Sequence, residues 1–148
     1  MDDKLLNWLY ANKMIVGGVA VLISVLTWSV ELMDLVYVCP FCRTQRTVIG
    51  LLGILILLPT MVHWISRYVA TVIGAFGFAV AARQHFGGWA NIMSGKFSWG
   101  ENWYVNSWML SGFAMFIITG LLLYIWTHRA QAEEAGEVEA AEAEDPAD

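Results

Sequence analysis

Four apolar segments, each long enough to cross a bilayer as a helix, restrict this chain of 148 residues to few folds. We place them at residues 14–38, 47–64, 68–86 and 108–126. A membrane-spanning helix needs about 20 mostly apolar residues. Only 14% of the residues are charged, against about 25% in an average soluble domain. The sequence therefore predicts an all-α integral membrane protein, folded as a four-transmembrane-helix up-down bundle.

The chain divides into a predicted transmembrane domain, residues 1–130, and a short acidic tail, residues 131–148. The apolar run that begins at Met14 is not followed by a cleavage site and polar sequence, so we expect a retained anchor. The tail is rich in Ala and Glu and lacks aromatic residues, which predicts disorder or a weak solvated helix. Basic residues are scattered, which argues against nucleic acid as a partner.

An even number of spans places both termini on one side of the membrane and the connections 39–46 and 87–107 on the other. Lysine and arginine do not decide the orientation, because four lie on each side. Discounting Arg46 and Arg83 as functional charges leaves a weak preference for cytoplasmic termini. A persistent disulfide also needs an oxidising compartment, so we expect the connection 39–46 outside the cytoplasm.

The connection between the third and fourth spans is rich in Trp and Tyr. These residues concentrate at membrane–water interfaces. We expect this segment to lie on the bilayer surface, with a short amphipathic helix near Trp89–Met93. Two interpretations stay open, an interfacial aromatic belt or a lid over a reactive site.

The only two cysteines, Cys39 and Cys42, lie in the sequence Cys-Pro-Phe-Cys-Arg-Thr-Gln-Arg between the first two spans. At this spacing they can form a disulfide in a tight turn that Pro40 stiffens. Arg46 follows Cys42 by one helical turn on the same face, and a helix that begins near Cys42 favours its thiolate. We therefore expect Cys42 to be the reactive thiolate, Cys39 to be more exposed, and Arg43 to point elsewhere.

The cysteine pair has three other interpretations. A zinc site needs about four ligands, and on this side only His85 and a carboxylate could join the cysteines, so we predict no metal. A soluble thioredoxin-like motif needs a βαβ context, which the sequence lacks. Two structural cysteines without turnover stay open, because C-x-x-C is a short pattern.

The sequence around the cysteines resembles the DsbB family of quinone-linked disulfide oxidases. The resemblance extends from about Met14 to Trp126, and its specific part is Cys39 to Arg46. The resemblance rests on the apolar span before Cys39-x-x-Cys42 and on the Gln45-Arg46 that opens the next span. Two further features are similar, Glu31 near the end of the first span and Ala82-Arg83-Gln84 near the end of the third.

The resemblance implies a bound quinone (ubiquinone or menaquinone) that abuts Cys42 and is contacted by Arg46. Cys39 then faces the protein partner, a thioredoxin-fold thiol oxidase or another dithiol protein. It also implies the bacterial inner membrane, with the termini in the cytoplasm and the two cysteines on the periplasmic side.

Other polar residues near the same membrane boundary as the cysteines are also candidates for a functional role. Glu31, which shares a helix face with Asp34, could pair with Arg46 or Arg83 or relay protons, or it could simply lie at the headgroup boundary. Arg83 is either a second cation over the quinone or an interfacial arginine that snorkels. Gln45 could donate a hydrogen bond to quinone. We interpret His85 as an interfacial residue rather than a proton donor.

The chain departs from the family in one respect that matters for its function. DsbB proteins typically carry a second cysteine pair in the third connection, and residues 87–107 contain no cysteine. A partner dithiol must then attack the Cys39–Cys42 disulfide directly, or another protein must supply the missing pair.

We expect an enzyme, a membrane thiol–disulfide oxidoreductase that passes electrons from a partner dithiol through Cys39–Cys42 to quinone and supports disulfide bond formation. The alternatives are a non-catalytic DsbB-like subunit or assembly factor of a larger membrane complex, and a thiol-handling module for metallocofactor maturation.

Overall fold

The computed structural model of the chain describes the backbone of residues 3–36, 38–99 and 106–144, and the side chains of 7–36, 38–99 and 106–128. Within these ranges all regular structure is helical. In chain order the helices are α1 (Asp3–Ala11), α2 (Lys13–Leu32), α3 (Pro40–Leu57), the 3₁₀ helix η1 (Pro59–Val62), α4 (Trp64–Met93) and α5 (Ser107–Glu144).

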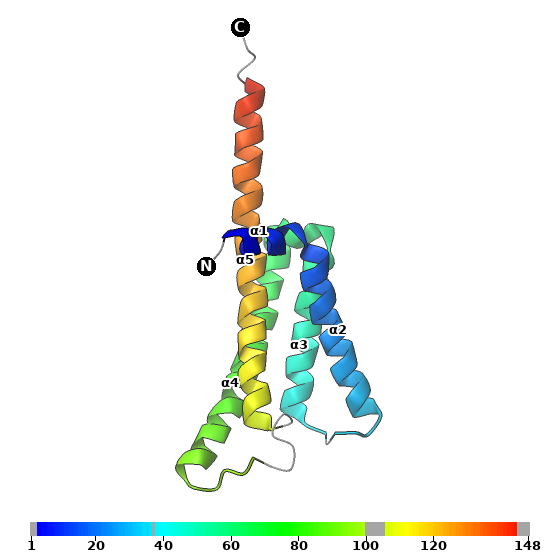
Figure 1. Cartoon of the computed structure of the whole chain (residues 1–148), viewed down its shortest axis with the longest axis vertical. Helices are drawn as coiled ribbons and strands as arrows, with labels where there is room; N and C mark the ends of the chain where they lie inside the picture. Colours follow the sequence, from blue (N-terminus) through cyan, green and yellow to red (C-terminus); the bar gives the residue numbers. More distant parts are fainter. Residues whose placement is uncertain (1–2, 37, 100–105, 145–148) are drawn as a thin grey trace.

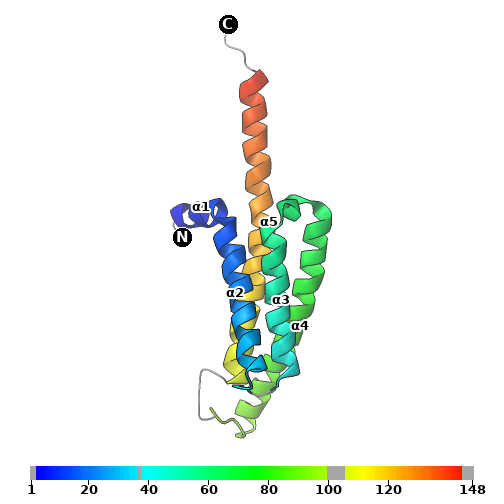
Figure 2. The same cartoon turned by 90° about the vertical axis from the view of Figure 1, so that its right-hand side faces the viewer.

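Helices α2, α3 and α4 and the Ser107–His128 part of α5 are each long and apolar enough to cross a membrane. The predicted all-α class with four such helices is therefore confirmed. Successive long helices run in opposite directions, as Figures 1 and 2 show. The α2–α3 and α4–α5 connections consequently lie at one end of the bundle, and α1 lies across the other end.

Helix α3 begins at Pro40, seven residues before the predicted start of the second span at residue 47. Proline is favoured at the first helical position, because its φ angle is already helical and its missing N–H has no intrahelical acceptor there. The polar residues from Arg43 to Arg46 lower the hydropathy of this turn without preventing the helix. Both arginines and Cys42 are therefore helical residues and not part of a hairpin loop.

The last two long helices also extend beyond the predicted spans. Helix α4 continues to Met93, so residues Trp89–Met93 are its last residues and not the separate short helix that we expected. Helix α5 continues to Glu144 and so includes the backbone of residues 131–144 of the tail. Residues 100–105 of the expected lid lie outside the described residues.

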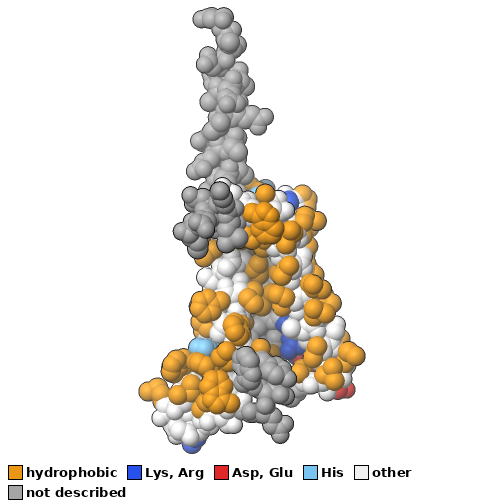
Figure 3. All heavy atoms as spheres, in the orientation of Figure 1, with side chains coloured by type: hydrophobic (Ala, Val, Ile, Leu, Met, Phe, Trp, Pro, Cys, Tyr) orange, Lys and Arg blue, Asp and Glu red, His pale blue; other side chains and the backbone are white. Residues whose placement is uncertain are grey.

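Helix α3 contacts α2, α4 and α5, and α4 packs along α5. The centre of the bundle is apolar, with Leu52 and Ile56 of α3 fully buried beside Ile118 of α5. Large apolar side chains also cover the outside of the bundle, as Figure 3 shows. An apolar outer surface of this extent marks contact with lipid or with another protein.

Small residues set the close approach of α2 and α3. A Cβ atom on Gly53 would lie 2.9 Å from Cβ of Ala20 and 3.0 Å from the carbonyl oxygen of Gly17. One turn closer to the cysteines, Ser24 Oγ donates to the carbonyl oxygen of Arg46 at 2.8 Å. This close contact holds the polar end of α2 against the first turns of α3, where the candidate site lies.

Candidate functional site

The two cysteines lie at the N-terminus of α3. Cys39 is the N-cap residue, with φ −121° and ψ 111°, and Pro40 follows in the first helical turn. The Sγ atom of Cys39 accepts a hydrogen bond from the backbone N–H of Cys42 at 3.3 Å. This sulfur therefore fills the position that a serine or aspartate oxygen takes in an ordinary N-cap. The N-cap geometry brings both sulfurs to the same end of the helix.

The Sγ atoms of the two cysteines lie 2.7 Å apart, and no disulfide bond joins them in this structure. Cys39 is buried, at 7% exposed, whereas Cys42 is half-buried. Our expectation that Cys39 is the more exposed cysteine is wrong. Because α3 begins at Pro40, Cys39 is the residue just before the helix, where it is buried. Cys42 lies in the first helical turn, where it is partly exposed.

A pair of glutamine side chains connects the cysteines to α4. Gln84 Nε2 lies 3.7 Å from the Sγ atoms of both Cys39 and Cys42. Its Oε1 atom accepts a hydrogen bond from Nε2 of Gln45 at 2.7 Å. Gln45 is buried, at 4% exposed, so its amide depends on this bond. The glutamine pair therefore fixes the position of an amide donor against both sulfurs.

Two arginines of α3 share one buried carboxylate of α2. Nη1 of Arg46 lies 2.7 Å from Oε2 of Glu31, and Nε of Arg43 donates to Oε1. The side chain of Glu31 is 2% exposed. Removing an ion from water costs several kcal/mol, which only close partners offset. Arg43 therefore does not point away from the site as we expected, since it lies at i−3 from Arg46 on the same helix face.

Backbone and aromatic contacts hold the guanidinium of Arg46 further. Nε donates to the carbonyl oxygen of Cys42 at 3.2 Å, and Nη1 donates to the carbonyl oxygen of Thr27 at 2.7 Å. The guanidinium carbon also lies 5.6 Å from the centre of the Trp28 ring. Among the described residues, these contacts and the Glu31 ion pair use the donors of Nε and Nη1. The two N–H groups of Nη2 are therefore available to a ligand. Arg46 is thus fixed in place with donors to spare.

The polar residues open into a groove of about 160 Å³ between α2, α3 and α5. Cys42, Gln45 and Arg46 line one part of it, and Ile49, Phe113 and Ile117 belong to its apolar wall. Figure 3 shows cationic atoms in the hollow between α2 and α5 at this end of the bundle. The groove thus combines a thiol, an amide and a guanidinium with a wall suited to an apolar ring.

Two other candidates lie apart from this groove. Arg83 is exposed and makes no hydrogen bond or ion pair within the described ranges. His85 belongs to an aromatic cluster on the α4–α5 side, where its ring stacks on Trp108 with centroids 5.2 Å apart. Nε2 of His85 lies 3.2 Å from Nε1 of Trp89, which can only donate. Nδ1 of His85 therefore carries the ring proton and faces the Trp108 carbonyl oxygen at 3.0 Å.

Gln84 and Arg43 are the contributors that sequence reasoning missed. Gly74, Gly77, Ala81 and Gln84 recur at helical spacing, and the first three are buried. That spacing already placed Gln84, and not Arg83, on the face of α4 that packs in the bundle. For Arg43, the spacing of three residues to Arg46 was the available signal.

No group of three or more His, Cys, Asp or Glu side chains that could hold a metal ion occurs in the described part of the chain. Comparison of the sequence with models of protein families and with curated proteins, and of the structure with solved structures, finds no match.

Proposed function

We propose that this chain is an atypical member of the DsbB family that oxidises a partner dithiol and reduces a membrane quinone. One observation carries the proposal, the shared groove in which Cys42, Gln45 and Arg46 meet an apolar wall. The groove lies near one end of four helices that are long and apolar enough to cross a membrane. This is the depth at which a lipid-soluble ring and a water-exposed thiol partner can both approach.

The residues of the groove fit a quinone head group. Pockets for drug-sized ligands are about 300–1,000 Å³, so a groove of about 160 Å³ suits a single ring whose tail extends into lipid. Phe113 and Ile117 offer apolar contact, and the spare Nη2 donors of Arg46 suit a ring carbonyl. When bound, quinone supplies the acceptor for two electrons and two protons.

The mechanism starts from the disulfide state of the pair. The thiolate of the partner attacks Sγ of Cys39, which breaks the Cys39–Cys42 bond, forms a mixed disulfide with the partner and releases Cys42 as a thiolate. The second thiol of the partner then attacks the mixed disulfide and leaves with its own disulfide formed. Cys39 and Cys42 return to the disulfide state as their two electrons pass to the acceptor beside Cys42. Overall, one partner dithiol and one quinone give one partner disulfide and one quinol.

The charged residues position and stabilise rather than transfer electrons. Glu31 holds the guanidinium groups of Arg43 and Arg46 against α2. Because one carboxylate faces two guanidinium groups, this cluster keeps one excess positive charge. A fixed positive charge beside the groove favours the negative charge that develops on an acceptor or on the Cys42 sulfur. Gln84 can donate to whichever sulfur becomes a thiolate.

Burial of Cys39 constrains the partner. A thioredoxin-fold or other dithiol protein must reach a sulfur that is 7% exposed, so the N-terminus of α3 has to open locally when the partner docks. The sequence between α4 and α5 contains no cysteine that could pass electrons from the partner to the Cys39–Cys42 pair. We place the cysteine end on the periplasmic side of a bacterial inner membrane and the termini in the cytoplasm.

The second candidate is a non-catalytic DsbB-like subunit or assembly factor of a larger membrane complex. The buried Cys39 favours it, since a scaffold protein has no need for an accessible sulfur. The two candidates differ in whether the purified chain turns over alone.

The test is quinone reduction by the purified full chain with a dithiol and a soluble quinone. We expect turnover in the wild type and a loss of at least about 10³-fold in Cys42→Ser, as for other essential nucleophiles. Cys39→Ser should be equally inactive. Equal rates in the wild type and Cys42→Ser would refute the enzyme proposal and leave the scaffold role.

A further inference from the structure

A second groove, of about 520 Å³, lies between α3 and α4. Its walls are apolar, formed mainly by Val48, Leu51, Val72 and Phe76. Neither cysteine lines it, and neither do Gln45 and Arg46. It is therefore distinct from the groove that holds the candidate redox site.

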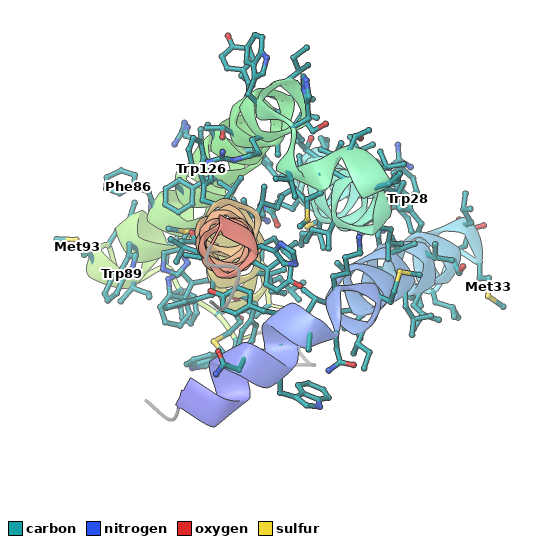
Figure 4. All side chains as sticks on the ribbon, turned by 90° about the horizontal axis from the view of Figure 1, so that it is seen from above. Trp28, Met33, Phe86, Trp89, Met93 and Trp126 are labelled. Carbon is teal, nitrogen blue, oxygen red and sulfur yellow. The ribbon has the colours of Figure 1, made fainter. Side chains whose placement is uncertain are left out.

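One end of this groove carries a cation. Arg43, whose side chain is 44% exposed, lines it together with Trp28, Thr44 and Thr47. The hydroxyl groups of both threonines already donate, to the carbonyl oxygens of Pro40 and Arg43 respectively. Arg43 uses Nε for Glu31, so its Nη donors are those that a ligand in the groove can meet. Figure 4 shows Trp28 on the opposite side of the bundle from Phe86 and Trp89 of α4.

The charged residue that lines this end of the groove is a cation, Arg43. Glu31 is the single carboxylate for Arg43 and Arg46, and it is buried while Arg43 is partly exposed. The excess positive charge is thus presented at the surface through Arg43. An anion offsets it, whereas a neutral molecule does not.

The groove is charged at one end and apolar along the rest of its length, as a phospholipid molecule is. Arg43 lies in the first turns of α3, and Leu51 lies eight residues deeper, about 12 Å along the helix axis. A charged head group at Arg43 and an acyl chain over Leu51, Val72 and Phe76 match this gradient. A guanidinium suits the phosphate of such a head group, because it can bind a phosphate through two parallel hydrogen bonds.

We propose that the α3–α4 groove is a binding site for one anionic phospholipid, with its phosphate on Arg43 and an acyl chain between the two helices. The site rests on the proposed membrane placement of the chain, not on its redox chemistry. The lipid covers the outer side of the Glu31–Arg43 ion pair and limits the access of water to it.

The test is native mass spectrometry of the full chain in detergent with dioleoylphosphatidylglycerol or with dioleoylphosphatidylcholine. We expect the wild type to retain the anionic lipid preferentially. Arg43→Gln should lower this preference about fivefold, which is the typical effect of one cation at a membrane surface. Arg43→Lys should largely keep it. The matched control Arg83→Gln removes an exposed arginine at the same end of the bundle and should leave the preference unchanged.

A groove-filling variant separates this site from the redox site. Val72→Trp should reduce the retention of both lipids and leave quinone reduction intact, because Val72 does not line the groove of Cys42. Three results would overturn the proposal. They are equal retention of the two lipids by the wild type, an equal effect of Arg83→Gln and Arg43→Gln on the lipid preference, and loss of quinone reduction in Val72→Trp.

Discussion

The two ends of the bundle differ in how their polar groups are held. At the cysteine end, Glu31 and Arg46 form a buried ion pair beside the two cysteines. At the opposite end, Tyr10 of α1 stacks on Tyr124 of α5, with ring centroids 5.6 Å apart, and donates to Thr127 Oγ1 at 2.6 Å. Buried charges are costly and are retained for function more often than for stability. Under the function we propose, the cysteine end carries the chemistry, because its buried carboxylate lies beside both cysteines and a groove, and the other end anchors α1.

One arginine at each end makes the contrast specific, the partly buried Arg46 and the buried Arg67. Arg46 meets a carboxylate and lies beside a groove. Arg67 lies 3.8 Å from the centre of the Trp126 ring, and Trp126 donates from Nε1 to Thr71 Oγ1 at 3.1 Å. Arg67 thus packs against a ring at one end, and Arg46 lines a groove at the other.

The largest effect on stability is expected from Glu31→Gln, which leaves two guanidinium groups without their carboxylate. Removing one partner of a buried ion pair typically costs about 3–5 kcal/mol. We expect a loss of about 3 kcal/mol in the free energy of unfolding in detergent, measured by circular dichroism. Asp34→Asn is the control, because Asp34 is exposed with φ 55°, a conformation that Asn tolerates. It should change stability by less than about 0.5 kcal/mol.

If both variants were equally stable, Glu31 would not organise the cysteine end, and the contrast between the two ends would fail at its most buried charge.

The next effect in size concerns Arg46 and quinone reduction. Arg46→Gln removes the fixed cation beside the groove, and loss of one such charge-stabilising group typically lowers turnover about 10²-fold. Arg83→Gln should change the rate less than about twofold, as expected for an exposed charge. The measurement is the steady-state rate with a dithiol and a soluble quinone. Similar losses in the two variants would show that general surface charge, and not the position of Arg46, matters.

The smallest effect is expected at the opposite end. Tyr10→Phe removes one hydrogen bond, to Thr127, and should lower the free energy of unfolding by about 1 kcal/mol. Quinone reduction should be unchanged, because Tyr10 does not line the groove of Cys42. A loss of turnover comparable to that of Arg46→Gln would mean that the two ends do not divide chemistry and anchoring between them.

Hydropathy predicted the number of long helices but not where they begin and end. The start of α3 depends on Pro40 in the first turn and Cys39 as N-cap, which are local signals that an average over about 20 residues hides. The tail is rich in Ala and Glu, residues with high helix propensity, and α5 continues through it to Glu144.

At the site, sequence reasoning selected Cys39, Cys42, Gln45 and Arg46 because they lie close together in one motif. It named Arg83 and not Gln84, although the helical spacing of Gly74, Gly77 and Ala81 already placed Gln84 on the packed face of α4. It offered Arg46 or Arg83 as partners of Glu31, and the structure pairs Glu31 with Arg43 and Arg46. Long-range ion pairs of this kind depend on how closely α2 and α3 approach, which is a tertiary property.

The central claim is that the sulfur of Cys42 faces a quinone in the groove between α2, α3 and α5. The most direct measurement is the visible absorption spectrum of purified Cys39→Ser with a soluble quinone, because a thiolate against a quinone ring gives a charge-transfer band. We predict a band in Cys39→Ser that is absent from the double variant Cys39→Ser/Cys42→Ser. The absence of any band, or a band that persists without Cys42, would contradict the claim.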